Sequence, residues 1–496
     1  MKHIYLFVVS IIALLGISSC ERESKTLYAI RVTDKIVCTS TAQMVDVDYS
    51  VHENILNSNV IVSVTSSESW VSVGNSSVIG EITLHVEENS GENRSAKITI
   101  SAPGCVSTSF TLMQYGTPPE VANHTLIFYF FGTSLDRYFK TNIEDAIKAI
   151  DTGILGNSNR VIIFRQKSKY EAYISELCYD VDGGECIEQR HVENITLPTP
   201  LITPEDIGGY IKQMADIAPA KRYGIVFASH GQGWIPREVL NGDGGISALS
   251  TMNVWQPAIG AEVTRAFGEN NVQVNPAELA EGIEKSGVEL DYILFDACFM
   301  SNIETIYDLR SAASYIIASP CEIMGKGFPY HRTLPYLFQN DGTTTDYVGA
   351  AESYYKFYRD EYSGTSRCGS IAVFDCREIE TLVNATSQVI KSAKSNDDID
   401  VDVLQTYEGQ TVHQFYDFGE WVNTVATDKE ALKAFNDQLN KTVVAKYSLP
   451  TFYSAYGSYG TYNIDLDVYS GVTTSAPSEA YPEYWKKTNW YKAVWE

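Results

Sequence analysis

The chain has 496 residues, of which 44% are hydrophobic and 20% are charged, so it can bury the cores of about three globular domains. Its formal net charge is −25, from 37 basic and 62 acidic residues. This acidity excludes nucleic acid and anionic membrane surfaces as partners, because both would repel the protein.

The amino terminus has the pattern of a targeting segment. Lys2 precedes an apolar run from Ile4 to Ile17 that is too short to span a bilayer and is typical of a secretory signal. Ser18-Ser19-Cys20 then resembles a bacterial lipoprotein cleavage site. The resemblance implies that residues 1–19 are a removed signal peptide and that Cys20 carries a lipid, which would be the only membrane contact. An ordinary secreted protein cut nearby is the alternative.

Residues 27–115 show the short alternating runs of an antiparallel β-sandwich, separated by clusters of Asn, Ser and Gly. Trp70 alternates with core positions, which predicts a buried ring. The order of SWVSV, ENSGENRSAKITISA and TLMQY resembles the BACON domain, an Ig-like module of exported proteins from Bacteroidetes-type bacteria. The resemblance implies either contact with a glycan or a spacer that lifts the next domain off the membrane, and we favour the spacer.

Residues 116–123, which include two adjacent prolines, predict a stiff linker. From residue 124 the pattern becomes β-α. The strand-like HTLIFYFFG precedes an amphipathic helix with Phe139, Ile143, Ile147 and Ile150 on one face. The fold class is therefore α/β, an open and mostly parallel sheet flanked by helices, preceded by an all-β Ig-like sandwich.

Two apolar runs in the middle of the chain end at polar residues. Residues 225–228 stop at Ser229-His230-Gly231, and residues 292–295 stop at Asp296-Ala297-Cys298. Residues 275–287 between them have the capping residue, the early proline and the final glycine of a helix. Such a crossover lays its two strands parallel, so His230 and Cys298 should meet at the carboxyl edge of the sheet. There an imidazole can activate a thiol. A buried cysteine and a loop histidine are the alternative.

These segments, SHGQGW and ILFDACFMSNIETIYDLR followed by YIIASP and GFPY, resemble the clostripain-like cysteine peptidases, relatives of caspases and gingipains. The resemblance covers residues 124–496 and implies a caspase-like fold that cleaves a protein or peptide with a His-Cys dyad. It implies His230 as base, Cys298 as nucleophile, and the backbone N–H groups of Gly231 and Cys298 as the oxyanion site. This chemistry requires no cofactor or metal, although the resemblance makes Ca²⁺ a candidate supporting ion. A peptide must be able to reach the sulfur.

Specificity is expected to depart from the family. The resemblance implies a preference for Arg or Lys before the cut bond (P1), which needs carboxylates in the pocket. Asp296 matches one acidic position, but Lys326 stands where a second carboxylate is implied. We therefore expect a P1 preference shifted away from Arg and Lys, with a Lys326 side chain in solvent as the alternative. The resemblance also implies self-cleavage within residues 232–268. Arg237 is the candidate site, and an uncut loop is the alternative.

Two functions compete on these patterns. The first is an exported endopeptidase that is lipid-anchored at the outer membrane of a Gram-negative, Bacteroidetes-type bacterium. The second is a glycan-binding or adhesive lipoprotein whose peptidase-like part is a silent scaffold. The presence of both His230 and Cys298 favours the enzyme, since a scaffold would need neither.

Overall fold

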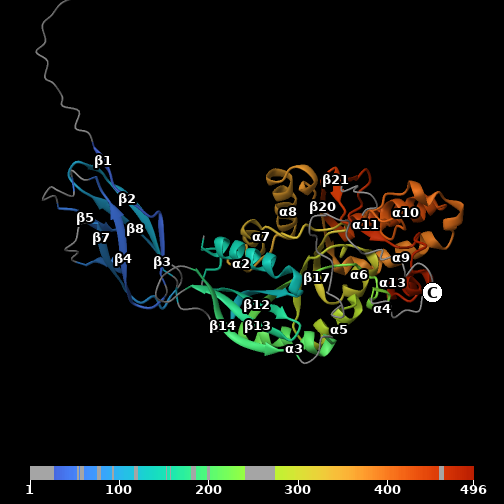
Figure 1. Cartoon of the computed structure of the whole chain (residues 1–496), viewed down its shortest axis with the longest axis horizontal. Helices are drawn as coiled ribbons and strands as arrows, with labels where there is room; N and C mark the ends of the chain where they lie inside the picture. The colour runs from blue at the N-terminus through green and yellow to red at the C-terminus, as the bar shows by residue number, and fades with distance from the viewer. Residues whose placement is uncertain are drawn as a thin grey trace, which may run out of the picture. The chain divides into compact units, whose positions relative to one another are not determined.

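The computed structural model describes residues 27–240 and 274–496, apart from short gaps at 39, 53–54, 56–60, 75–79, 92–93, 115, 117–120, 152, 157, 180–185, 198–201 and 457–462. Cys20 and most of the predicted self-cleavage loop therefore lie outside the described residues. The chain divides into two compact units, one amino-terminal and one carboxyl-terminal (Figure 1). None of the helices in the described ranges has the length and apolar character needed to cross a bilayer.

The amino-terminal unit is built from β-strands, as predicted. One sheet has the order β3-β10-β8-β5 and a second has the order β2-β4-β7-β6. Burial alternates along the longer strands, so that Ala96, Ile98 and Ile100 of β8 are buried. The ring of Trp70 is buried, as predicted, with the guanidinium of Arg94 4.3 Å from its centroid. The strands of these two sheets are β2 (Arg31–Val32), β3 (Lys35–Cys38), β4 (Gln43–Ser50), β5 (Ser63–Ser66), β6 (Val71–Val73), β7 (Glu81–Val86), β8 (Arg94–Ser101) and β10 (Thr108–Gln114), and β1 (Tyr28–Ala29) pairs separately with β9 (Cys105–Val106).

The second unit contains a nine-stranded sheet with the order β14-β13-β12-β11-β15-β16-β17-β18-β20. The central strands β12, β11, β15, β16 and β17 are parallel to one another, while β13 and β14 at one edge and β18 and β20 at the other pair antiparallel. This confirms the mostly parallel sheet. The strands are β11 (Ala122–Phe130), β12 (Asn159–Ser168), β13 (Glu171–Tyr179), β14 (Cys186–Thr196), β15 (Ala220–Ala228), β16 (Leu290–Asp296), β17 (Ala313–Ala318), β18 (Ser370–Asp375) and β20 (Val443–Ser448). β11 thus begins inside the stretch predicted as linker.

Helices cover both faces of this sheet (Figure 1). On one face α2 (Asp136–Ile150) packs on α7 (Tyr330–Leu337), which packs on α8 (Tyr347–Glu361). On the other, α3 (Pro204–Ile217) packs on α5 (Pro276–Ser286), and α5 packs on α6 (Ile303–Leu309). The predicted helix between the two central strands is α5. Asn275 and Glu278 form its capping box, and Gly287 ends it at a φ of 68°.

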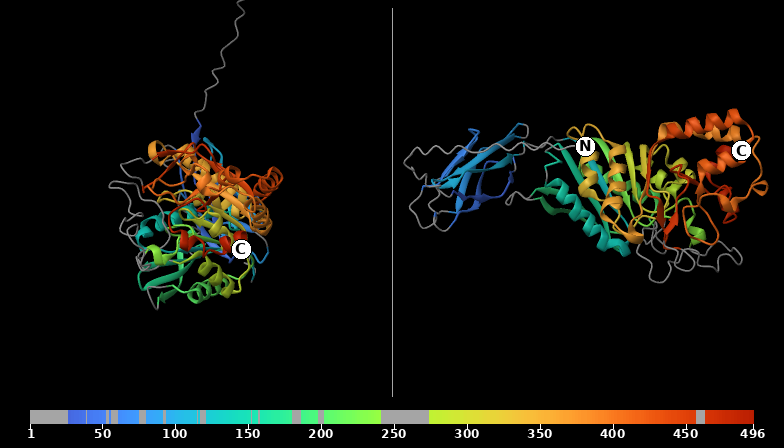
Figure 2. Two further views of the ribbon diagram at one scale, coloured as in Figure 1. Left: turned by 90° about the vertical axis from the view of Figure 1, so that its right-hand side faces the viewer. Right: turned by 90° about the horizontal axis from the view of Figure 1, so that it is seen from above.

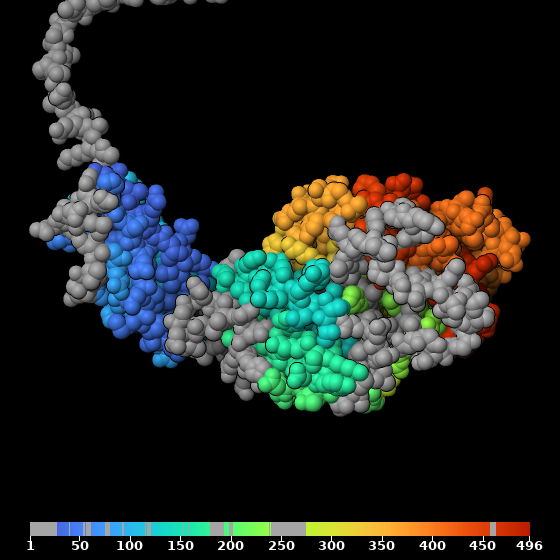
Figure 3. All heavy atoms as spheres, viewed as in Figure 1, coloured from blue at the N-terminus to red at the C-terminus, as the bar shows by residue number. Residues whose placement is uncertain are grey.

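The last third of the chain adds helices α9 (Ile379–Ile390), α11 (Lys429–Thr442) and α13 (Asn489–Trp495). α9 packs on both α11 and α13, and α13 also packs on α6. Figure 2 shows these orange and red helices gathered at one end of the unit. The space-filling view shows the orange and red residues of the last third of the chain at the same end of this unit (Figure 3). The peptidase-like unit is thus one body built around a single sheet.

Candidate active site

The central strands end along one edge of the sheet. Ala228, the last residue of β15, pairs with Asp296, the last residue of β16. His230 and Cys298 each follow their strand end by two residues. Because the strands are parallel, both positions lie at the carboxyl edge, where open α/β sheets place ligands.

The sulfur of Cys298 contacts the backbone of Ile323. Sγ accepts a hydrogen bond from the backbone N–H of Ile323 at 3.2 Å and lies 3.6 Å from the carbonyl oxygen of the same residue, to which the thiol can donate. The Cys298 residue is 0% exposed. The sequence-based requirement that a peptide can reach the sulfur is therefore not met in this conformation, since the segment after β17 lies against it.

The chain turns sharply directly after Cys298. Phe299 has a φ of 57°, a left-handed conformation that is strained for a residue with a side chain. Its N–H donates to the carbonyl oxygen of Cys321 at 3.1 Å, and its carbonyl oxygen accepts from the side chain of Asn302 at 2.6 Å. Its ring stacks on Phe415 with centroids 5.0 Å apart. Contacts from several segments thus fix the backbone next to the Cys298 thiol.

The loop after β15 packs against the same backbone. A Cβ added at Gly231 would lie 2.1 Å from the carbonyl oxygen and 2.9 Å from the nitrogen of Cys298, so only glycine fits there. The backbones of the two residues with predicted oxyanion N–H groups are therefore in contact. His230 is half-buried, and its Nε2 lies 2.8 Å from the hydroxyl oxygen of Ser134.

Asp296 is fully buried beneath this edge. Its Oδ2 accepts hydrogen bonds from the N–H of Phe328 at 3.2 Å and from the hydroxyl of Tyr330 at 2.7 Å. The carboxylate therefore holds the Phe-Pro-Tyr turn in place. Lys326 lies just before that turn, where its carbonyl oxygen accepts from the side chain of Asn142 at 2.9 Å. Its ammonium lies 4.9 Å from the ring centroid of Phe357, a cation–π contact.

A second buried carboxylate, Glu322, was not predicted. Its Oε1 accepts from the hydroxyl of Ser454 at 2.7 Å and from the N–H of Ala455 at 2.9 Å. Burial raises the pKa of the Tyr456 hydroxyl, and the proximity of the Glu322 and Cys298 side chains raises it further. Glu322 thus ties residues 454–456 to the segment that contacts the sulfur. The only indication of Glu322 in the sequence was its position in the segment that follows β17.

Arg237 is anchored to the start of α5. It begins the short helix α4 (Arg237–Leu240), and its guanidinium forms two contacts of 2.8 Å with the carboxylate of Glu278. Its N–H donates to the side chain of Asn275 at 3.1 Å. In the part of the chain that the structure describes, no group of three or more His, Cys, Asp or Glu residues could hold a metal ion. No residues are therefore assigned to calcium.

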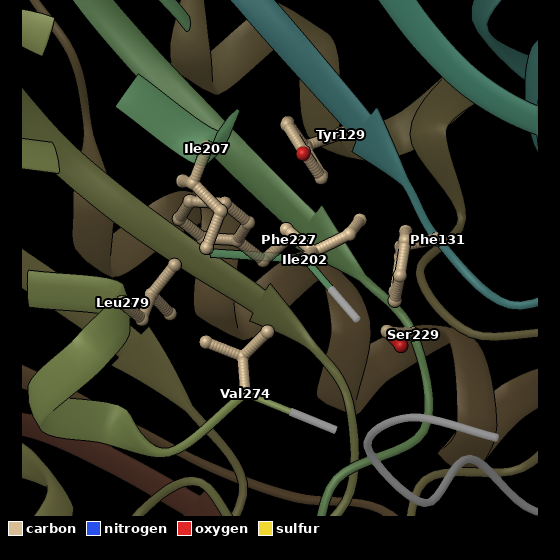
Figure 4. A pocket seen from close by; sticks show the side chains of 8 residues that line it. All are labelled: Tyr129, Phe131, Ile202, Ile207, Phe227, Ser229, Val274 and Leu279. Carbon is tan, nitrogen blue, oxygen red and sulfur yellow. The ribbon is translucent and has the colours of Figure 1, made fainter. Parts of the chain in front are cut away.

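An apolar pocket lies beside the histidine loop, on the α3 and α5 face of the sheet (Figure 4). The space in it that a water molecule can occupy is small, about 20 Å³. Its wall is aromatic and aliphatic apart from Ser229, the neighbour of His230. The lining residues are Tyr129, Phe131, Ile202, Ile207, Phe227, Ser229, Val274 and Leu279.

A sheet with a parallel centre, and with a histidine and a cysteine after the ends of adjacent central strands, fits the class of cysteine peptidases. The chain belongs to the clostripain family (C11), which matches residues 134–471. It is a cysteine endopeptidase. Of the two functions predicted from the sequence, the comparisons therefore favour the enzyme over the binding protein with a silent scaffold. Residues 60–114 match BACON, a family of N-terminal domains to which a binding role is ascribed.

Solved structures agree with this assignment. A secreted C11 cysteine protease from Bacteroides thetaiotaomicron is 30% identical, with 76% of this chain and 100% of that chain covered and a TM-score of 0.65. An inactive zymogen C11 protease from Parabacteroides distasonis is 28% identical, covering 76% of this chain and 99% of that chain, with a TM-score of 0.62. A second secreted C11 protease from B. thetaiotaomicron, in complex with an irreversible peptide inhibitor, shares the fold at 22% identity, with 75% and 99% covered and a TM-score of 0.61. A comparison with curated proteins gave no match.

Proposed function

We propose that the chain cleaves peptide bonds with Cys298 as nucleophile and His230 as base. Sγ transfers its proton to the imidazole and attacks the carbonyl carbon of the substrate, and the N–H groups of Gly231 and Cys298 donate to the oxyanion. The tetrahedral intermediate collapses to a thioester as the leaving amine takes the proton from the imidazolium. Water, deprotonated by His230, then attacks the thioester and releases the acid and the thiol.

The observation that carries this proposal is the register of the two central strands. Ala228 pairs with Asp296, and the histidine and the cysteine follow at equal spacing. An irreversible electrophilic peptide probe tests it. We expect mass spectrometry to locate an adduct on Cys298 in the wild type, no adduct in Cys298→Ala, and strongly slowed labelling in His230→Ala. Labelling of Cys298→Ala at the wild-type rate would refute the assignment.

The preferred P1 residue is neutral or acidic rather than Arg or Lys. Two observations support this: Oδ2 of Asp296 is committed to the turn at Phe328 and Tyr330, and the cation of Lys326 lies next to that turn. A panel of fluorogenic peptides that differ only at P1 provides the test. We expect weak cleavage after Arg, which improves about tenfold in Lys326→Asp. Strong cleavage after Arg by the wild type, unchanged in that variant, would contradict the proposal.

Self-cleavage after Arg237 opens access to the buried thiol. This is a single intramolecular cut, so the weak cleavage after Arg that is proposed above is sufficient for it. The support is the 0% exposure of Cys298 together with the likeness to a relative described as an inactive zymogen. Before it can enter the active site, the Arg237 side chain must leave the carboxylate of Glu278. Mass spectrometry of the wild type beside Cys298→Ala tests this step. We expect a nick at Arg237 in the wild type alone, and an intact, fully active wild type would exclude it.

The enzyme is exported and anchored by lipid on Cys20, with the sandwich unit as a spacer. The secreted relative supports export, and the burial of Trp70 argues against a glycan platform at that ring. Labelling cells with an alkyne analogue of palmitate is the test. We expect label in the wild type and none in Cys20→Ser, whereas equal labelling of both would place any lipid elsewhere.

A further inference from the structure

The hydroxyl of Ser134 contacts the histidine from a neighbouring strand. Ser134 lies in η1 (Thr133–Leu135), directly after β11, and is exposed. Its Oγ is 2.8 Å from Nε2 of His230. β11 and β15 are parallel neighbours with Phe130 paired to Ala228, so both residues come from adjacent strand ends at one edge. The contact thus joins two residues that lie 96 positions apart in the sequence.

The turn that carries Ser134 is held in place by contacts with neighbouring strands and with the core. Gly132 has a φ of 116°, which requires glycine, and its N–H donates to the side-chain oxygen of the buried Gln166 at 3.1 Å. The N–H of Phe131 donates to the carbonyl oxygen of Ala228 at 3.0 Å. Leu135 anchors the far side of the turn in the core. The hydroxyl is therefore held at the histidine by backbone and core contacts.

The ring edge that faces this turn is known from two contacts. Nε2 meets the hydroxyl of Ser134, and a Cβ added at Gly132 would lie 4.0 Å from Cδ2 of the same ring. The Cδ2–Nε2 edge of His230 is therefore turned toward the end of β11. Nδ1 lies across the ring from this edge, and the proposed dyad assigns to it the exchange of a proton with the thiol.

We propose that Ser134 is a positioning residue for His230, a role that rests on the proposed His230–Cys298 dyad. Its oxygen accepts the Nε2–H, which keeps the lone pair on Nδ1. Nδ1 takes the proton from Sγ of Cys298 and later gives it to the leaving amine. The Nε2–H stays bonded to the hydroxyl oxygen throughout and stabilises the imidazolium.

The test compares Ser134→Ala with Ser134→Thr, which keeps a hydroxyl, in the form of the full chain that cleaves peptide. We expect Ser134→Ala to lower kcat about tenfold and to leave KM within about twofold, because the side chain touches the base and not the substrate. The limb of the pH–kcat profile that reports the imidazole should move to lower pH, since the protonated ring loses an acceptor. Ser134→Thr should recover most of the rate and the wild-type profile.

Thr141→Ala, which removes a hydroxyl from α2 that donates to the carbonyl oxygen of Arg137, is the matched control and should behave as wild type. An unchanged rate and profile in Ser134→Ala would overturn the proposal. So would a lower rate with an unshifted profile or without recovery by threonine, because either result indicates a structural role only. Activity of Cys298→Ala would instead refute the dyad itself.

Discussion

The hydroxyl of Tyr330 donates to the buried carboxylate of Asp296, and nearby the hydroxyl of Tyr358 donates to the neutral carbonyl oxygen of Gly327 at 2.9 Å. Both tyrosines are fully buried. A hydrogen bond to a charged group contributes about 1.5–3 kcal/mol and a neutral one about 0.5–1.5 kcal/mol. We therefore predict that Tyr330→Phe lowers the free energy of unfolding by about 1 kcal/mol more than Tyr358→Phe, measured by urea denaturation. Equal losses would mean that Asp296 is not charged in the folded protein.

At the residue scale, the sequence predicted the positions that follow strand ends. His230 and Cys298 were found because each stops an apolar run. Ser134 follows the strand-like HTLIFYFFG in the same way and could have been found by the same rule. The neighbours of the sulfur could not, because Ile323 contacts it through backbone atoms and Glu322 acts through a loop more than a hundred residues away. Any residue type can make a backbone contact, so such a contact cannot be recognised in the sequence.

At the element scale, the contact between the loops after β15 and β16 depends on one glycine. A Cβ at Gly231 would meet backbone atoms, which cannot rotate away. We predict that Gly231→Ala abolishes cleavage and lowers the free energy of unfolding by about 1–3 kcal/mol, the usual range for overpacking. Gly209→Ala is the control. It lies exposed in α3 with nothing within 4 Å of its added Cβ, and should gain up to about 1 kcal/mol at full activity. Normal cleavage by Gly231→Ala would mean that the two loops separate in the active form.

The loop of residues 408–415 supports the turn after Cys298 through Phe415 and carries a pH-sensitive contact. Nδ1 of His413 lies 3.2 Å from Oε2 of the buried Glu408, which raises the pKa of His413 above 6.5 against the opposing effect of burial. The charged ring is favoured in the folded state, so its contribution to stability is complete below pH 6.5 and is lost as the pH rises through the raised pKa. We predict that the thermal midpoint of the wild type falls above pH 6.5 and that His413→Gln flattens this fall.

His331 gives a control of opposite sign for this experiment. Burial lowers its pKa below 6.5, although Asp145 opposes the effect. The neutral ring is favoured in the folded state, so its contribution is present above pH 6.5 and is lost as the pH falls. His331→Gln should therefore change the slope of the thermal midpoint only on the acid side. A flattened slope above pH 6.5 in this variant, and not in His413→Gln, would show that the roles of the two histidines were assigned wrongly.

At the scale of the whole molecule, the alternation of β and α patterns was enough to predict a mostly parallel sheet behind a β-sandwich. It was not enough to predict the antiparallel direction of β18 and the pairing of β20 at one edge of the sheet. Their direction depends on the connections between strands, and β18 reaches β17 only after α7 and α8. The burial of Cys298 was likewise beyond the sequence, because local patterns do not show which distant backbone covers a side chain. Whether a segment forms a strand or a helix depends mainly on its local sequence, whereas access to the thiol depends on how the whole unit is assembled.

The division into two compact units leads to the last prediction. All the residues assigned to catalysis and to the support of Cys298 lie in the carboxyl-terminal unit, between Ser134 and Tyr456. A chain that begins at residue 116 should therefore fold and cleave soluble peptides with a kcat/KM within about twofold of the full chain. The same truncation carrying Cys298→Ala should be inactive. If the sandwich unit instead binds the substrate, the truncated chain will show a raised KM at unchanged kcat. That result would replace the spacer role with a binding role.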